Sequence, residues 1–280
     1  MVIAILVLGG IALLAAVVLY VCSRKFAVHE DPRLAEVAAV LPQANCGGCG
    51  FAGCAGLAAA IVKGADIGSV DGLSCPVGGD DVMKQIARLL DIAPTASEPR
   101  IATVMCNGSC DRRINTVYYD GLHTCYTMNA TAMGESPCGY GCLGCGDCAS
   151  ACQFGGIRIN PHTRLPEVDA TLCTACGSCV AACPRGVIEL RPRGKKDRRV
   201  YVCCNNKDKG AASTKACSVS CIGCGKCAKE CPFNAIAIQD NLAVINPAKC
   251  RLCRKCEAAC PRNAIVAVNF PEKTRKEAEA

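Results

Sequence analysis

The sequence is poor in residues that usually fill a protein core or act in an enzyme active site. It has no Trp, five Phe and six Tyr among 280 residues, so few large side chains can fill the cores of its domains. It also lacks a C-x-x-C-H haem attachment motif, a P-loop and a recognisable Ser/His/Asp arrangement. These absences argue against a c-type haem protein, a nucleotide hydrolase and a serine hydrolase.

Cysteine, by contrast, is abundant. The 28 cysteines in 280 residues are typical of either a disulfide scaffold or a metal protein. Metal would also compensate for the small core, because ligand binding contributes directly to folding.

The N-terminus helps to separate these two interpretations. Residues 1–22 carry no charge and are long enough to cross a bilayer, and Arg24 and Lys25 follow. No basic segment precedes the apolar run and no clear cleavage site follows it, which favours an uncleaved anchor over a signal peptide. The positive-inside rule then predicts a single-pass protein of the inner (cytoplasmic) membrane. Its remainder would lie in the reducing cytoplasm, where dense cysteine indicates metal ligation.

The formal charge of +7 does not indicate a nucleic-acid partner. The sequence has no base-reading motif and no basic segment interleaved with aromatics. An all-thiolate [4Fe–4S] cluster carries about −2 when oxidised, so six clusters would make the loaded protein mildly acidic.

The last two thirds of the chain contain an internal repeat. GCLGCGDCASACQFGGIRI at 141–159 is similar to SCIGCGKCAKECPFNAIAI at 220–238, and the motif at 172–190 is similar to that at 249–268. Each pair follows a strand-like stretch ending in Cys-Asn, at 102–107 and 200–205. We therefore predict an anchor (1–22), a small α-helical domain (30–92) and two similar modules (101–190 and 198–270), with a boundary near 93–100.

The repeated units are four C-x2-C-x2-C-x3-C motifs, three of them followed by Pro. In two-cluster proteins with this motif, three cysteines bind one [4Fe–4S] cluster and the fourth binds the neighbouring cluster. This rule predicts four crossed ligand sets. The first set is Cys142, Cys145, Cys148 and Cys183; the second is Cys152, Cys173, Cys176 and Cys179; the third is Cys221, Cys224, Cys227 and Cys260; the fourth is Cys231, Cys250, Cys253 and Cys256.

A structural zinc site is the alternative to these clusters. Zinc also binds C-x2-C pairs, but two such pairs are usually separated by a longer spacer. Four complete motifs in two pairs favour [4Fe–4S] clusters. The modules are similar to bacterial two-cluster ferredoxins, and this resemblance implies paired hairpins and short helices around two clusters.

A further group of four cysteines precedes the modules. Cys46, Cys49, Cys54 and Cys75, here called the N-terminal set, have the ligand count for a fifth cluster. The glycines among them let the backbone fold closely around sulfide. Gly48, Gly50 and Gly53 also match a dinucleotide fingerprint, but no strand precedes them and cysteines interrupt them, so we reject that interpretation.

The order of these parts resembles the B subunit of the Rnf complex, the ion-translocating ferredoxin:NAD oxidoreductase. An apolar N-terminal helix, CGGCGFAGC followed by CPVGG, and modules with GCLGCGDC and CIGCGKCAKECPF carry the resemblance, which covers nearly the whole chain. It implies an α+β electron-transfer subunit of a translocase that makes or breaks no substrate bond itself. It would accept electrons from soluble reduced ferredoxin and pass them to membrane-bound and peripheral partner subunits.

Seven cysteines lie outside these sets and the anchor. Cys106, Cys110, Cys125 and Cys138 could bind a sixth cluster, or could be buried as small apolar side chains. Cys138 and Cys217 each precede a ferredoxin motif by four residues, which indicates ligation or a shared packing role. Cys203, Cys204 and Cys217 stay unassigned at this stage. Two other functions remain open: an electron-transfer subunit of another membrane oxidoreductase, such as a hydrogenase, and a zinc-stapled scaffold.

Overall fold

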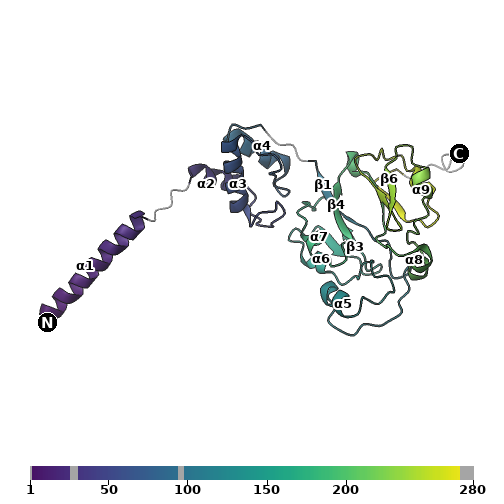
Figure 1. Ribbon diagram of the computed structural model, residues 1–280, viewed down its shortest axis with the longest axis horizontal. Helices are drawn as coiled ribbons and strands as arrows, with labels where there is room; N and C mark the ends of the chain where they lie inside the picture. The colour runs from purple at the N-terminus through teal and green to yellow at the C-terminus, as the bar shows by residue number, and fades with distance from the viewer. Residues whose placement is uncertain (1, 26–30, 94–97, 272–280) are drawn as a thin grey trace.

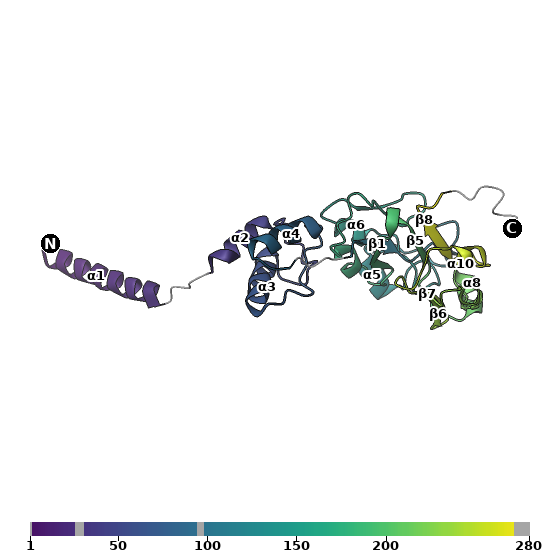
Figure 2. The same ribbon diagram turned by 90° about the horizontal axis from the view of Figure 1, so that it is seen from above.

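We analysed a computed structural model that describes residues 2–25, 31–93 and 98–271. The first element, α1 (Val2–Lys25), is a continuous apolar helix. Its segment Leu6–Lys25 has a mean hydropathy of 2.5 and none of it is buried, so by length and composition it could cross a membrane. In both views α1 lies apart from the rest of the chain (Figures 1 and 2).

Three helices form the next part of the chain: α2 (Pro32–Val40), α3 (Cys54–Ile67) and α4 (Gly79–Leu89). Their shared core includes Val37, Leu57, Ile61 and Ile86, none of which is more than 1% exposed. Complete burial of such a side chain contributes about 1.5–3 kcal/mol. Aliphatic side chains therefore form most of this core, in a sequence with few aromatic residues.

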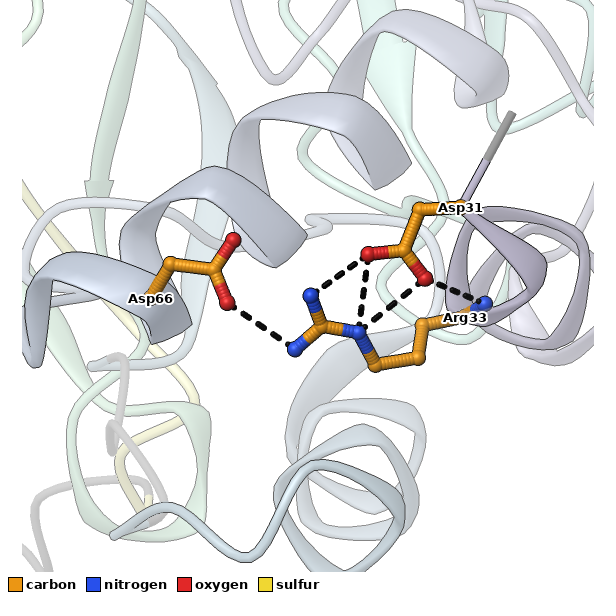
Figure 3. A network of polar contacts seen from close by, with 3 residues as sticks. All are labelled: Asp31, Arg33 and Asp66. Atoms are coloured by element: carbon orange, nitrogen blue, oxygen red, sulfur yellow. Dashed lines mark hydrogen bonds and ion pairs between the residues drawn. The ribbon is translucent and has the colours of Figure 1, made fainter. Parts of the chain in front are cut away.

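The start of α2 is fixed by its cap. Asp31 accepts a hydrogen bond from the Arg33 backbone N–H at 2.9 Å, and Pro32 occupies the first helical position. The Arg33 guanidinium also binds Asp31, which lowers the pKa of that carboxyl, and donates to Asp66 of α3 at 2.9 Å (Figure 3). These side chains are accessible to solvent, so the network adds little free energy of folding. It links α2 to α3 and orients one helix on the other.

Two similar halves follow, each with two antiparallel strand pairs. In the first half, β1 (Arg100–Val104) pairs with β4 (Ile188–Pro192) and β2 (Ile157–Ile159) pairs with β3 (Pro166–Val168). In the second, β5 (Arg199–Val202) pairs with β8 (Ile265–Val268) and β6 (Ile236–Gln239) with β7 (Leu242–Ile245). Two-stranded sheets are marginally stable alone, so these halves need further support from bound metal or from each other.

Short helices complete the halves. The four-residue helices are α6 (Asp147–Ser150), α7 (Ser178–Ala181), α9 (Lys226–Lys229) and α10 (Lys255–Ala258). The others are α5 (Cys125–Thr131), α8 (Gly210–Ala216) and the 3-10 turn η1 (Lys195–Asp197). The mixed α+β fold class predicted from the sequence is confirmed. The domain boundaries stay predictions, and residues 1, 30 and 94–97, on which they partly rest, lie outside the described residues.

Candidate iron–sulfur sites

Each ferredoxin motif presents its third cysteine in the same way. The residue before each four-residue helix is left-handed: Gly146 (φ 96°), Gly177 (φ 85°), Gly225 (φ 74°) and Arg254 (φ 63°). This conformation turns the chain sharply and is easiest for glycine. The third cysteines follow two residues later and are all buried: Cys148, Cys179, Cys227 and Cys256.

The crossed arrangement is clearest in the second and third sets. Cys152, Cys173, Cys176 and Cys179 line one cavity. Cys221, Cys224, Cys227 and Cys260 line another. In both cavities the fourth cysteine of one motif therefore joins the first three of the other, as the two-cluster rule requires.

Electrostatics also place these cysteines near one another. Burial, together with repulsion from the thiolates of Cys173, Cys176 and Cys152, raises the pKa of Cys179 to about 11. For Cys256, burial and the neighbours Cys250 and Cys253 raise the pKa to about 11. Iron would offset this repulsion, because a coordinating thiol is held deprotonated by the metal charge.

Three cysteines of the fourth set lie in or against the core of the second half. Cys256 is buried there, Cys231 and Cys250 pack against the same core, and Cys253 is exposed. Phe270 packs against it as well, below the guanidinium of Arg254 at 5.0 Å from the ring centroid. Arg254 also forms an ion pair with Glu257 at 2.7 Å, so several contacts hold the only one of these four helix starts that is not glycine.

The first set contains an unexpected neighbour. Its cavity is lined by Cys142, Cys148 and Cys183 together with Cys125, the first residue of α5. The Cys125 side chain forms a hydrogen bond with that of Cys145. Asp147 holds the start of α5 in place by accepting hydrogen bonds from the backbone N–H groups of Cys125 and Tyr126 at 2.9 and 3.0 Å. Cys125 thus shares a cavity with three first-set cysteines and lies next to the fourth, Cys145.

The N-terminal set lies on the loop before α3 and at the turn before α4. Cys54 and Cys75 are buried, while Cys46 and Cys49 are half-buried. Asn45 accepts a hydrogen bond from the Cys54 N–H at 2.8 Å, and the Cys75 sulfur accepts one from the Gly78 N–H at 3.3 Å. A Cβ on Gly53 would lie 2.8 Å from the side-chain oxygen Oδ1 of Asn45, and Gly53 has a φ of 96°, so this position favours glycine.

The same loop touches the first ferredoxin half. A Cβ on Gly48 would lie 2.8 Å from the Cα of Cys176, closer than real Cβ atoms approach. Gly48 and Cys49 of the N-terminal loop also share a cleft with Cys173 of the second set. The N-terminal set and the second set are therefore adjacent in space.

The arrangement of donors is unlike that of a single-ion site. In the described ranges 2–25, 31–93 and 98–271, no group of three or more His, Cys, Asp or Glu side chains is placed to hold one metal ion. Around one zinc, thiolates converge on a centre about 2.3 Å from each sulfur. A cubane instead binds one thiolate at each of four separate irons, so its ligands stand farther apart.

The structure does not bring together the four cysteines named above as a possible sixth ligand set: Cys106, Cys110, Cys125 and Cys138. The Cys110 sulfur faces the Thr163 carbonyl oxygen at 3.6 Å, and Cys125 lies in the first-set cavity. Cys106 and Cys138 instead share a cavity with Cys203, Cys204 and Cys217 of the second half. Sequence proximity therefore does not identify these partners, although Cys138 and Cys217, which occupy matched places in the repeat, both line this cavity.

Comparisons with known proteins agree with this geometry. The family model for a 4Fe-4S dicluster domain matches residues 141–187, 172–235 and 220–264. A second model, described as "Putative Fe-S cluster", matches residues 41–68.

Full-length relatives extend the match over most of the chain. The B subunit of the proton-translocating ferredoxin:NAD(+) oxidoreductase complex of Clostridium ljungdahlii is 43% identical over 240 residues, 86% of this chain and 82% of the relative. The chain belongs to the family of Rnf-type B subunits.

Two other Rnf-type B subunits show a similar span. That of the Na(+)-translocating complex of Acetobacterium woodii is 39% identical over 88% of this chain and 71% of its own length. That of the ion-translocating oxidoreductase complex of Methanosarcina acetivorans is 42% identical over 87% and 89%.

The predicted family, function class and enzyme class are therefore confirmed. The chain is the iron–sulfur electron-transfer B subunit of a multi-subunit, ion-translocating ferredoxin:NAD oxidoreductase of the Rnf type. It is part of a membrane complex and carries one N-terminal apolar helix. Membership of this family argues against the two alternative functions considered above, a hydrogenase subunit and a zinc-stapled scaffold.

Proposed function

We propose that this Rnf-type protein is a one-electron relay that holds five [4Fe–4S] clusters, in the N-terminal set and the first to fourth sets. The observation that carries the proposal is the crossed gathering of cysteines from separate motifs around common cavities. Such clusters accept and donate single electrons, with potentials set by burial and by hydrogen bonds to sulfur. The chain's part is to hold the ligands at fixed spacing.

The contact between Gly48 and Cys176 supports a route through the protein. It makes the N-terminal set and the second set neighbours, and the crossed ligands link the second set to the first. Soluble reduced ferredoxin is the proposed electron donor, and the other membrane and peripheral subunits of the complex are the proposed acceptors. The names of the Clostridium and Acetobacterium relatives, which include ferredoxin and NAD(+), support this assignment.

The anchor and its flanking charges support a location on the cytoplasmic side of the inner membrane. Arg24 and Lys25 end α1, and positive residues next to a span favour the cytoplasmic side. The test is protease digestion of intact cells and of inverted membrane vesicles. Cleavage of residues 31–271 in inverted vesicles alone is the expected result, and cleavage in intact cells would contradict this orientation.

Metal analysis tests the relay itself. Anaerobically purified protein should contain at least about 20 irons with matching sulfide, since five four-iron clusters require them, and dithionite should produce reduced-cluster resonance signals. Replacing Cys152 with Ala should lower the iron content, because one corner of the second-set cluster loses its ligand. Zinc in place of iron, or an unchanged iron content in that variant, would reject the proposed ligand sets.

A further inference from the structure

The two ferredoxin halves are joined by direct backbone contacts. The Asn107 N–H donates to the Cys203 carbonyl oxygen at 3.1 Å, and the Ser218 N–H donates to that of Arg112 at 2.8 Å. Arg113 and Cys217 form an isolated antiparallel bridge. Because these contacts come from both halves, the surface between them is a fixed part of the fold.

A cavity lies at this junction, and cysteines from both halves line it. Cys106 and Cys138 come from the first half, Cys204 and Cys217 from the second. Two glycines leave room between the sulfurs. A Cβ on Gly108 would lie 3.5 Å from the Cys217 sulfur and 3.6 Å from that of Cys106, and one on Gly141 would lie 3.3 Å from that of Cys138.

The four cysteines occupy equivalent positions in the repeat. Cys106 follows β1 and Cys204 follows β5, each directly before an Asn. The Cys106 sulfur accepts a hydrogen bond from the Cys142 N–H at 3.4 Å, and the Cys204 sulfur accepts one from the Cys221 N–H at 3.3 Å. Cys142 and Cys221 are the first cysteines of their ferredoxin motifs.

The second pair is matched in the same way. Arg185 donates to the Cys138 carbonyl oxygen at 2.9 Å, and Arg262 donates to that of Cys217 at 3.1 Å. Each arginine follows the Pro of its half's second motif. Equivalent contacts in the two halves therefore hold the cysteines that line the cavity.

All four sulfurs accept N–H hydrogen bonds, as ligating thiolates do. The Cys138 sulfur accepts one from the Asn206 side-chain amide at 3.3 Å, and that of Cys217 accepts one from the Val219 backbone. Cys203 lines the same cavity, but its sulfur faces the Val104 carbonyl oxygen at 3.5 Å as well as the Cys106 backbone N–H. Its counterpart in the first half is the buried Met105, which indicates a packing role.

A half-buried arginine with two buried, unused donor atoms also lines the cavity. Arg113 lines it and donates one hydrogen bond, to the Cys142 carbonyl oxygen at 2.8 Å. Its Nε and Nη2 are buried and have no hydrogen-bond partner among the described residues. An unpaired buried guanidinium donor is costly, so an anionic group in the cavity would satisfy it.

From these observations we infer that Cys106, Cys138, Cys204 and Cys217 bind a sixth [4Fe–4S] cluster shared between the two halves. Four thiolates and a net charge of about −2 match the donor set and the unpaired arginine. The inference rests on the proposed relay and extends it. The site lies between the first and third sets, since its sulfurs bind the N–H groups of Cys142 and Cys221. It therefore joins two otherwise separate pairs of clusters by outer-sphere transfer of one electron at a time.

The test is iron and sulfide per chain on the full-length protein after anaerobic reconstitution. The expected wild-type content is about 24 irons, four for each of six clusters. The double variant Cys204→Ala/Cys217→Ala should lose four irons and four sulfides per chain and keep the other 20. The integrated resonance signal after reduction should fall in step.

Cys203→Ala is the matched control, because it removes the adjacent buried cysteine and should leave the iron content unchanged. The variant Cys106→Ala/Cys138→Ala should repeat the loss from the other half. A wild-type content of about 20, or an unchanged content in the double variants, would overturn the sixth site and leave the five-cluster relay intact. Loss of zinc rather than iron would likewise overturn it. If the variants do not fold, the wild-type content alone decides between 24 and 20.

Discussion

Single residues decide which cysteines can act as ligands. Cys203 and Cys204 are neighbours in sequence and both are buried, but the Cys203 sulfur also faces a carbonyl oxygen, that of Val104. Accepted N–H bonds stabilise a thiolate, whereas a donated S–H requires a protonated thiol. The Val104 carbonyl oxygen therefore favours a protonated thiol at Cys203, whose counterpart in the first half is the buried Met105.

Cys125 supplies a prediction at this scale. Because it lines the first-set cavity beside Cys145, we expect Cys145→Ala to keep its full iron content through ligation by Cys125. The double variant Cys125→Ala/Cys145→Ala should lose between one and four irons. The measurement is iron per chain after anaerobic reconstitution.

Cys176→Ala is the control for this exchange. It is the equivalent residue of the second set, whose cavity contains no fifth cysteine, so that variant should lose iron. Equal losses in Cys145→Ala and Cys176→Ala would show that Cys125 does not substitute.

Ligand sets made from neighbouring motifs could be predicted from the sequence, whereas contacts between the two halves could not. The motif spacing was sufficient to predict crossed ligand sets, because the two-cluster rule links motifs that lie close in the chain. Partners for Cys106 and Cys138 could not be found in the same way. Cys204 and Cys217 meet them only because the two halves pack together, and this packing depends on tertiary contacts such as Asn107 to Cys203.

Among the elements, the four short helices share one requirement, a left-handed residue before the first turn. Three motifs meet it with glycine, and the fourth uses Arg254 with its ion pair and its contact with Phe270. The repeated C-G-x-C pattern therefore reflects a backbone need as well as a ligand spacing. The same need explains why short, weakly helical segments recur at equivalent places.

Gly225 tests this requirement without a steric clash. A Cβ there would have no neighbour within 4 Å, so Gly225→Ala adds only the cost of a left-handed alanine, about 1–2 kcal/mol. At about 2–4 °C per kcal/mol for a domain of this size, the apparent unfolding temperature should fall by several degrees. Gly56→Ala, in the first turn of α3, is the control and should leave the temperature unchanged or higher. An equal change in unfolding temperature in the two variants would contradict the requirement for a left-handed residue at this position.

At the scale of the whole molecule, the described parts meet at defined contacts, with α1 apart from them. Figure 2 shows α2–α4 next to the first ferredoxin half, with the second half beyond it. The order of the parts places the N-terminal set at one end of a row of clusters. Spacing along that row depends on the close approach of Gly48 to Cys176.

A larger side chain at position 48 should therefore slow electron transfer without removing a cluster. In Gly48→Leu the added side chain would meet the Cys176 backbone and push the N-terminal loop away. We expect ferredoxin-dependent NAD+ reduction by the assembled complex to fall by about tenfold or more, since small misplacements can cost on the order of a hundredfold. Iron per chain should not change. Wild-type turnover in this variant would mean that electrons bypass the contact.

The crossed ligand sets also impose a sequence of events in time. As the chain leaves the ribosome, Cys142, Cys145 and Cys148 emerge before Cys183, so the first-set cavity stays open until the second motif has been made. Cys106 and Cys138 wait longer still, until Cys204 and Cys217 have emerged. Domains generally fold in the order of synthesis. In the order of synthesis the N-terminal set is therefore complete first, the junction cysteines after Cys217, and the third and fourth sets last, so a chain stalled near residue 190 has Cys106 and Cys138 without Cys204 and Cys217.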